Sequence, residues 1–508
     1  MELTELTEKF KSVLNIEKIC DAPQKIMQTI TSCADDTLRE WENYFPDLSD
    51  DQLQPIFQYY MADRKEKMQD YTSKSLAKAC VISADISNAQ SCYDMCAGSG
   101  ALTIQAWNIN KDCHFICEEF DERVIPFLIF NLALRNTNAT VIHGNVLSGE
   151  RFKAWKLTSS KQFSMIMEIL PPKTVSVDVC ISNPPYNMKW QHDPFMQLDD
   201  RFNLYGLPPE SNANYAFILS ALVSAKRAAL ILPNNVLEGG VKSEREIRKE
   251  IVENNKIDSI ILNPDNMFES TAISTCLFCL DNNKSDTFVE FIDMRNTYIE
   301  EKRKQKGQIG SKCHTNRIYE KSVKVFSDGN VDTMLQAVKN RTDSAEFAKS
   351  SSIQDIKSFE FSLNPLKYIE FVHREPKHRE YKEILADINQ IAIEKNKCKL
   401  VINETLAKRL GFDISLYKNK NLSDDQLENL IQKLTGDKLI KHDYIQFTKN
   451  KNEFVFKNNC ADSVSTILIS ILQMWKQHIM YLNEEENKYL LEMRDALLPD
   501  LMSGKIEP

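Results

Sequence analysis

DMCAGSG, at residues 94–100, follows a β-like apolar run and precedes the helical pattern ALTIQAW of residues 101–107. A strand-to-helix turn without side chains at positions 98 and 100 lets the backbone approach a ligand closely, and it directs the N–H groups of the helix N-terminus at that ligand. Glycine is scarce in the chain, with 13 among 508 residues, yet seven glycines lie between residues 98 and 240. This region is therefore the first candidate for a binding site.

Seven β-like runs alternate with amphipathic stretches between about residues 71 and 294. They are CYDMC (92–96), HFICEE (114–119), ATVIHG (139–144), VDVCIS (177–182), AALILP (228–233), IDSIIL (257–262) and STCLFCL (274–280). This alternation predicts an α/β fold with an open, Rossmann-like sheet of seven strands. Ligands of such sheets bind beyond the C-terminal ends of the strands, where DMCAGSG is expected to lie.

The composition describes a globular chain of two to four domains, with 42% hydrophobic and 27% charged residues. The net charge of −9 argues against non-specific coating of nucleic acid but allows a local basic surface. We expect a cytoplasmic protein without a membrane partner, because no apolar run approaches the length of a membrane span and the start MELTELTEKF lacks a signal-peptide pattern.

The 13 cysteines are an odd number scattered through apolar runs, which favours reduced thiols over a disulfide framework. Cys276 and Cys279 form a CxxC within a β-like run, but no second pair or histidine cluster lies at zinc spacing. We expect no metal site.

Four regions are expected along the chain: an N-terminal helical domain (1–65), the α/β domain (66–300), a basic linker and return segment (301–369) and a mainly helical C-terminal domain (370–508). The stretch 301–324 holds eight Lys or Arg against two Glu, which is typical of a solvated linker or of phosphate contact.

The C-terminal region carries two further patterns. Residues 437–457 resemble a basic β-hairpin after a helix around 423–435, which predicts either a winged DNA-binding unit or a small capping subdomain. Apolar residues at helical spacing over 464–497 predict one long helix or a helical hairpin that packs against a partner helix.

A second constellation lies after another predicted strand. Asn183-Pro184-Pro185-Tyr186 (NPPY) ends the run VDVCIS, 85 residues after Gly98. Glu119 follows Gly98 by 21 residues at the end of the run HFICEE, a spacing that suits an acidic side chain on both hydroxyls of a ribose. The dinucleotide fingerprint is not met, because position 103 is Thr.

With DMCAGSG and NPPY in this order, the chain resembles the S-adenosylmethionine-dependent amino-methyltransferases, specifically the adenine-N6 DNA methyltransferases of the gamma class. The resemblance implies S-adenosyl-L-methionine as the cofactor. It implies that the methionine part is held by Asp94, Cys96, Ala97, Gly98, Ser99 and Gly100, the ribose by Glu119 and the adenine ring by Asn145, with further cofactor contacts from Thr72 and Asn183. The family often has Asp where Asn145 stands, and Phe-Thr-Pro where residues 71–73 read Tyr-Thr-Ser.

The resemblance also implies that NPPY is catalytic. An exocyclic amine is a poor nucleophile, because its lone pair is delocalised into the ring. Two acceptors, the side-chain oxygen of Asn183 and the carbonyl of Pro184, would hold the two N–H bonds and aim the lone pair at the methyl group. Pro185 would stiffen the loop, and Tyr186 would stack on the flipped base.

Further segments resemble modification subunits of type I restriction-modification systems. They are RFNLYGLPPESNANYAFILSAL (201–222), LPNNVLEGG (232–240), EIRKEIVENNKID (246–258), FIDMRN (291–296) and FSLNPLKYI (361–369), whereas the closing LLPDLMSGKI (497–506) resembles the end of specificity subunits. The implied function is site-specific methylation of adenine in double-stranded DNA within a restriction-modification system. Two alternatives are a modification or binding subunit that is active only with a separate specificity subunit, and a methyltransferase of RNA or protein glutamine. The implied partners are double-stranded DNA and a specificity subunit or a second copy bound through the C-terminal helices.

Overall fold

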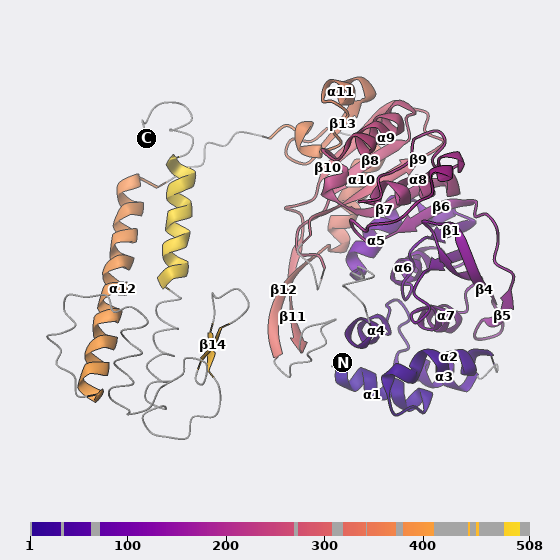
Figure 1. Cartoon of the computed structure of the whole chain (residues 1–508), viewed down its shortest axis with the longest axis horizontal. Coiled ribbons are helices and arrows are strands. Elements are labelled where there is room, and N and C mark those ends of the chain that lie inside the picture. The colour runs from indigo at the N-terminus through magenta and orange to yellow at the C-terminus, as the bar shows by residue number, and fades with distance from the viewer. Residues whose placement is uncertain are drawn as a thin grey trace. The chain divides into compact units, whose positions relative to one another are not determined.

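The structure, a computed structural model, describes residues 3–31, 35–61, 72–268, 273–306, 318–341, 343–371, 379–410, 445–447, 454–456 and 482–497 (Figure 1). Contacts divide the chain into two compact units, Met1–Val372 and His373–Pro508. No helix among these residues combines the length and the apolar character needed to cross a membrane.

An eleven-stranded sheet forms the centre of the first unit, in the order β13-β10-β8-β9-β7-β6-β1-β2-β3-β4-β5. The seven predicted strands are its contiguous middle: β1 Ser91–Asp94, β2 His114–Glu119, β3 Ala139–Asn145, β6 Val177–Ser182, β7 Ala225–Pro233, β8 Ile257–Leu262 and β9 Thr275–Asp281. These seven strands are parallel except β9, which runs antiparallel between β7 and β8. The predicted Rossmann-like α/β fold is confirmed.

The predicted strand count of seven was too low, because four strands that flank the predicted seven were not recognised. β4 Glu150–Thr158 and β5 Met165–Ile169 extend the β3 edge as antiparallel strands, and β10 Phe288–Asp293 and β13 Ala348–Ser352 extend the β8 edge. β4 interleaves charged and apolar residues, and most of its side chains and those of β5 are exposed or half-buried. A strand with an exposed face needs little apolar sequence, so β4 and β5 lack the signal that marks the central strands.

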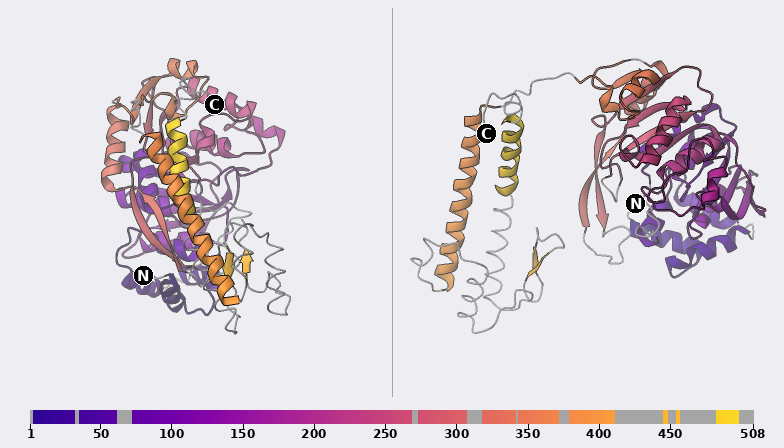
Figure 2. Two further views of the ribbon diagram at one scale, coloured as in Figure 1. Left: turned by 90° about the vertical axis from the view of Figure 1, so that its left-hand side faces the viewer. Right: turned by 45° about the horizontal axis from the view of Figure 1, so that its top comes forward.

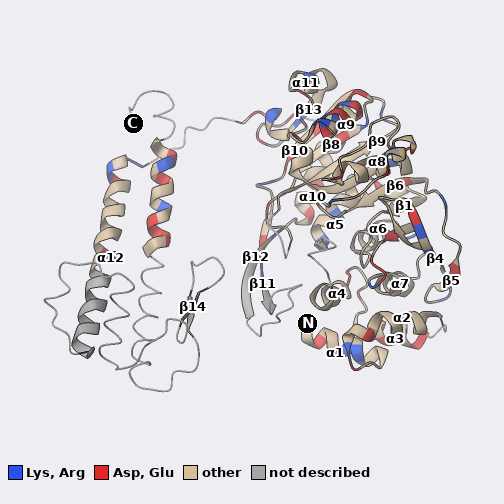
Figure 3. Ribbon diagram, viewed as in Figure 1, with Lys and Arg blue, Asp and Glu red and all other residues tan. Residues whose placement is uncertain are grey.

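Helices cover both faces of the sheet (Figure 2). α5 Lys74–Ser83, α6 Ala101–Ile109, α7 Ile125–Leu134 and α10 Asp328–Asn340 pack into one apolar cluster, and α8 Asn214–Ser224 and α9 Lys242–Glu253 pack into another. On its exposed side α9 carries both basic and acidic residues (Figure 3). Cys276 belongs to one cluster and Cys279 to the other, so these two residues of β9 lie on opposite faces of the sheet and cannot share a metal ion.

The N-terminal helices share the core of the sheet domain. They are α1 Leu3–Leu14, α2 Ala22–Thr31, α3 Asp35–Tyr44 and α4 Gln54–Tyr60. The ring of Phe10 lies 4.9 Å from Trp41 within these helices, and 5.9 and 5.8 Å from Phe127 and Phe130 of α7. α7 is apolar and buried on every side because the sheet covers one of its faces and these helices cover another. The predicted helices are present, but they have no core separate from the sheet.

The segment 301–369, predicted as a basic linker and return segment, contains regular structure. β11 Ile299–Lys306 pairs with β12 Ile318–Val325 as an antiparallel hairpin, and residues 307–317 lie outside the described part. α10, the edge strand β13 and α11 Ile353–Ser358 follow. The first unit therefore continues to Val372 and does not end near residue 300.

The second unit contains α12 Tyr381–Leu410, a helix over residues 482–497 and the antiparallel pair β14 Ile445–Phe447 and β15 Phe454–Phe456. Arg379, just before α12, donates to Glu492 at 2.8 Å, and Lys395 of α12 donates to Glu486 at 2.7 Å, which joins the two helices. The predicted hairpin within 437–457 and the helical character of 482–497 are confirmed. The predicted helix around 423–435 and the stretch 464–481 lie outside the described residues.

We expect Phe10→Ala to destabilise the whole first unit. Truncating a buried phenylalanine costs about 3–5 kcal/mol, and this ring contacts α7 as well as α3. Thermal unfolding should show one transition at a lower Tm, whereas Phe152→Ala, at a half-exposed site on β4, should change the Tm little. A new early transition that leaves the main one unmoved would instead indicate an independent N-terminal domain.

Candidate active site

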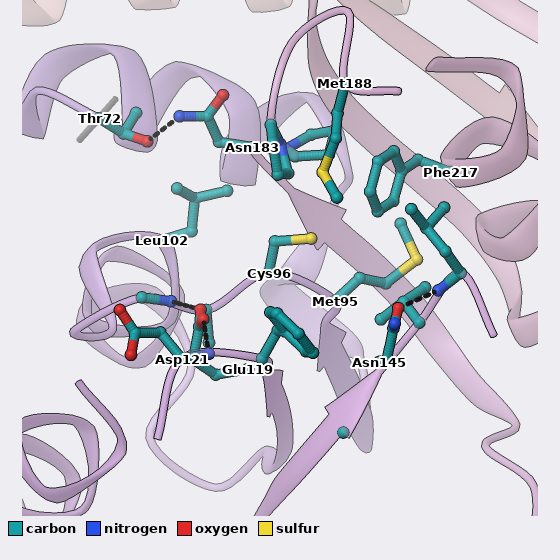
Figure 4. A pocket seen from close by; sticks show the side chains of 18 of the residues that line it. Thr72, Met95, Cys96, Leu102, Glu119, Asp121, Asn145, Asn183, Met188 and Phe217 are labelled. Carbon is teal, nitrogen blue, oxygen red and sulfur yellow. Dashed lines mark hydrogen bonds between the residues drawn. The ribbon is translucent and has the colours of Figure 1, made fainter. Parts of the chain in front are cut away.

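A pocket opens at the C-terminal ends of β1, β2, β3 and β6, lined by the loops that follow these strands (Figure 4). All of the predicted site residues except Asp94 and Gly100 line it. They are Thr72, Cys96, Ala97, Gly98, Ser99, Glu119, Asn145, Asn183, Pro184, Pro185 and Tyr186. The DMCAGSG and NPPY segments, distant in sequence, therefore border one cavity.

The two glycines of DMCAGSG have different structural roles. Gly98 lines the pocket with φ +55°, and Gly100 precedes α6 with φ +104°. Both values belong to the left-handed region that favours glycine. A Cβ on Gly100 would also lie 3.0 Å from the Leu128 side chain of α7, so this residue allows close packing behind the loop and does not contact the pocket.

Asp94 supports the loop from beneath. It is buried at the end of β1, and its Oδ2 accepts a hydrogen bond of 2.8 Å from the hydroxyl of Thr103 in α6. Burial raises the pKa of Asp94 to about 7, although the bond from Thr103 lowers it, and the charge of Glu119 raises it further. The structure thus places Asp94 behind the loop, where it ties β1 to α6.

Glu119 joins two loops at the pocket wall. One carboxylate oxygen accepts the N–H of Gly98 at 2.8 Å, and the other accepts the N–H of Asp121 at 2.7 Å. Burial raises the pKa of Glu119 despite the N–H groups of Asp121 and Gly98, which lower it. Each carboxylate oxygen has a further acceptor site, so the group can still receive hydroxyl donors from a ligand.

Asn145 stands at the end of β3, where its Oδ1 accepts the N–H of Leu147 at 3.0 Å. This bond fixes the turn that follows and leaves the amide NH₂ as the group available to a ligand. Close packing explains why the neighbouring residue 144 is a glycine, because a Cβ there would lie 2.6 Å from Oε1 of the buried Glu118. Glu118 is itself held by Arg151 at 3.0 Å.

Asn183 is oriented by hydrogen bonds from both ends of its amide. Its Nδ2 donates to Thr72 Oγ1 at 2.8 Å, and its Oδ1 accepts from the Tyr186 hydroxyl at 2.6 Å. Thr72 precedes α5 and is 111 residues away in sequence, so the structure gives it an orienting contact that its motif did not reveal. The ring of Tyr186 is only 7% exposed and meets Phe268 edge-on at 6.0 Å.

Residues near α4 support the pocket from the N-terminal side. Asn131 of α7 donates to Oδ1 of the buried Asp51 and to the backbone carbonyl of Ser99, both at 2.8 Å. Gln54 donates to the carbonyl of Thr72 at 3.1 Å. Residues 51–54 are thus linked to both sides of the pocket, to Ser99 through Asn131 and to Thr72 directly. Sequence reasoning missed these residues, because isolated polar side chains form no motif.

Apart from Asp121, the remaining lining is apolar, and it was also not predicted. It includes Met95, Leu102, Phe120, Met188 and Phe217. Such side chains suit the flat, weakly polar face of a base, while the polar groups at the rim provide direction. Phe217 lies in the mainly apolar helix α8, whose composition indicates burial but not which side chain meets a cavity.

Comparison with known proteins matches the model of the N-6 DNA methylase family to residues 48–377, which is more than half of the chain. The chain belongs to this family. The family match begins before α4 and ends just beyond the first unit, so it includes the sheet, the pocket and the segment that carries Asp51.

Relatives of this N-6 DNA methylase family member include methylase subunits of type I restriction enzymes. That of MpnII from Mycoplasma pneumoniae is 25% identical over 368 residues, which are 68% of this chain and 61% of the relative. That of HindI from Haemophilus influenzae is 23% identical over 385 residues, 71% of this chain and 78% of the relative. The chain thus spans less than two thirds of the MpnII subunit.

A solved structure with the same fold is the type I restriction-modification methyltransferase subunit from Streptococcus thermophilus. The TM-score is 0.51 at 22% identity, and the match covers 73% of this chain and 77% of that one. The likeness confirms the fold of this N-6 DNA methylase family member.

The raised pKa of Asp94 predicts a pH-dependent stability. Because the folded pKa of about 7 exceeds the ordinary value of 3.8, the stabilisation from this group is complete below pH 3.8 and is lost as the pH rises through 7. Replacing it by Asn removes the titration. Between pH 5 and 7, stability should fall less steeply in Asp94→Asn than in the wild type, by roughly 1 kcal/mol per pH unit.

Thermal unfolding over this pH range measures the difference. Asp112→Asn, at an exposed site before β2, is the matched control and should keep the wild-type profile. Parallel profiles for wild type and Asp94→Asn would show that Asp94 does not carry the effect.

Proposed function

We propose that this chain transfers a methyl group from S-adenosyl-L-methionine to the N6 amine of an adenine flipped out of double-stranded DNA, as the methylase of a restriction-modification system. The observation that carries the proposal is the shared pocket, in which the DMCAGSG loop and Glu119 face Asn183 of NPPY. Membership in the N-6 DNA methylase family and relatives named as type I methylase subunits support the same reaction.

The lining suits the proposed cofactor. Glu119 offers free acceptor sites for the two ribose hydroxyls, and Asn145 offers its amide NH₂ to a ring nitrogen of the adenine. Phe120 and Leu147 provide apolar surface between these two groups. When bound, the cofactor supplies a sulfonium methyl group, and loss of that group leaves a neutral thioether.

The amine would be activated by the chain's own acceptors. Oδ1 of Asn183 accepts the Tyr186 hydroxyl, and in the proposed complex it would also accept one N–H of the adenine amine, while the carbonyl of Pro184 takes the other. The bond from Asn183 to Thr72 prevents the amide from turning its NH₂ toward the substrate. The nitrogen lone pair forms the new bond to carbon, the carbon–sulfur electron pair stays on sulfur, and the methylated amine releases a proton to water.

The second unit supports a partner. Its helices expose four large apolar side chains to about half: Leu385 and Ile393 of α12, and Leu490 and Leu491 of the helix at 482–497. We therefore infer that residues 373–508 bind a specificity subunit or a second copy of the chain, and that this region contributes to DNA recognition. Methylation by the purified single chain would exclude an obligatory separate subunit.

Asn183→Ala should slow methylation far more than it weakens cofactor binding. Loss of a preorganised transition-state acceptor typically costs about 10²–10³-fold in rate. The assay is transfer of labelled methyl groups to host genomic DNA lacking this modification, followed by mass spectrometry of the nucleosides. Calorimetry measures the cofactor affinity, and Asn254→Ala, at an exposed site after α9, is the control. Methylation of RNA or protein in place of DNA, or full activity of Asn183→Ala, would contradict the proposal.

Glu119→Gln should weaken cofactor binding more than it slows the reaction. The amide keeps one acceptor oxygen, so it cannot hold the N–H groups of Gly98 and Asp121 and also receive two hydroxyls. We expect the cofactor KM to rise about 10-fold or more, as for a lost charge-assisted hydrogen bond. The exposed neighbour Glu122→Gln should behave as wild type. An unchanged KM with a lower kcat would assign Glu119 to the chemical step instead.

A further inference from the structure

The segment between NPPY and α8 forms a loop that rises from the rim of the pocket. Its base is closed by two backbone bonds of 2.9 Å, from Ala213 N–H to the Met188 carbonyl and from Trp190 N–H to the Glu210 carbonyl. Met188 lines the pocket and follows Tyr186 by two residues. The loop therefore begins and ends at the proposed site of methyl transfer.

A second anchor holds the loop to the opposite side of the pocket. Arg201 donates to the carbonyl of Val146 at 2.6 Å, and Val146 lines the pocket after β3. The guanidinium is fixed by Asp199, at 2.8 Å. Trp190 and Phe202 are buried beneath the loop with their rings 5.9 Å apart. These contacts make the loop a firm platform.

Two large apolar side chains project from this platform into solvent. The 3₁₀ helix η3 Pro194–Leu198 leaves Phe195 78% exposed and Leu198 77% exposed. Residues three apart in a 3₁₀ helix lie on the same side, so the two form one apolar tip. The carboxylate of Asp193 accepts the Phe195 N–H at 2.8 Å and fixes the start of η3. Because both side chains are exposed to solvent, the protein does not gain the free energy that their burial would provide. We therefore expect another molecule to cover this apolar tip.

We propose that Phe195 and Leu198 form a wedge that enters the base stack of the DNA as the target adenine leaves it. The inference rests on the proposed function, because an adenine inside a duplex cannot reach Asn183 without flipping. Flipping leaves a gap between base pairs, and proteins that deform DNA fill such gaps with apolar side chains. An apolar tip anchored to both sides of the pocket has the position and chemistry for this task.

The loop carries four acidic residues, Asp193, Asp199, Asp200 and Glu210, against the basic Lys189 and Arg201. Two of its acidic groups are engaged locally, Asp193 at the start of η3 and Asp199 with Arg201. Lys189, at the rise of the loop, is exposed and available to a phosphate. The proposed contact of the tip is therefore with the uncharged base stack, and Lys189 is the group placed to meet a phosphate.

The test compares two duplexes that carry a target site located by sequencing modified adenines in the host genome. In one duplex the target adenine pairs with thymine; in the other it lies opposite an abasic position, where flipping costs least. The proteins, purified with any subunit that accompanies them, are the wild type, the double variant Phe195→Ala/Leu198→Ala and the control Met167→Ala/Leu170→Ala. The control residues are 63% and 91% exposed, in and after β5.

On the paired duplex the double variant should methylate about 10- to 100-fold more slowly than the wild type, because it no longer fills the gap. On the abasic duplex its rate should return to within a few-fold of the wild type. The fluorescence of 2-aminopurine at the target position should rise with the wild type and the control but not with the double variant. Phe195→Trp should retain the wild-type behaviour.

If the wild type is active, three results would contradict the proposed wedge. The double variant could methylate as fast as the wild type, or it could lose rate equally on both duplexes. It could also fail to retain a subunit that copurifies with the wild type. The last would identify the tip as a protein contact. A wild type inactive on both duplexes would overturn the proposed function, and the wedge with it.

Discussion

The carboxylate of Glu119 is the contact on which the arrangement of the pocket depends. Its two oxygens hold the N–H groups of Gly98 and Asp121, so the loops after β1 and β2 are fixed by one side chain. Burial raises the pKa of Glu119, and the two N–H donors offset part of that cost. An apolar residue could pack between the loops, but it would leave the Gly98 N–H unpaired and the pocket without an anionic acceptor.

The N-terminal helices extend this constraint. The amide of Asn131 donates to both Asp51 and the carbonyl of Ser99, and Gln54 donates to the carbonyl of Thr72, whose hydroxyl in turn accepts from Asn183. A displacement of α4 would therefore disturb both the DMCAGSG loop and the Asn183 amide. Because Phe10 and α7 share one core, such a displacement is opposed by apolar packing as well as by hydrogen bonds.

The central strands and the two motifs could be predicted because each has a local signal. Continuous apolar runs mark strands buried on both faces, and the turns at DMCAGSG and NPPY follow directly from them. β4 carries no such run, and residues 299–325 appear as a charged stretch although they contain two paired strands. The roles of Asn131 and Thr72 depend on tertiary contacts, which no spacing in the sequence encodes.

Asp94 illustrates how one member of a predicted binding loop can have a structural role. Its position at the head of DMCAGSG suggested contact with a ligand, yet its side chain faces α6 and bonds to Thr103. Thr103 occupies the place where a dinucleotide-binding loop would have its third glycine. A hydroxyl at this place can bind the carboxylate, and a glycine cannot. Thr103, the residue that excludes the dinucleotide fingerprint, therefore also supplies the hydrogen-bond donor that holds β1 against α6.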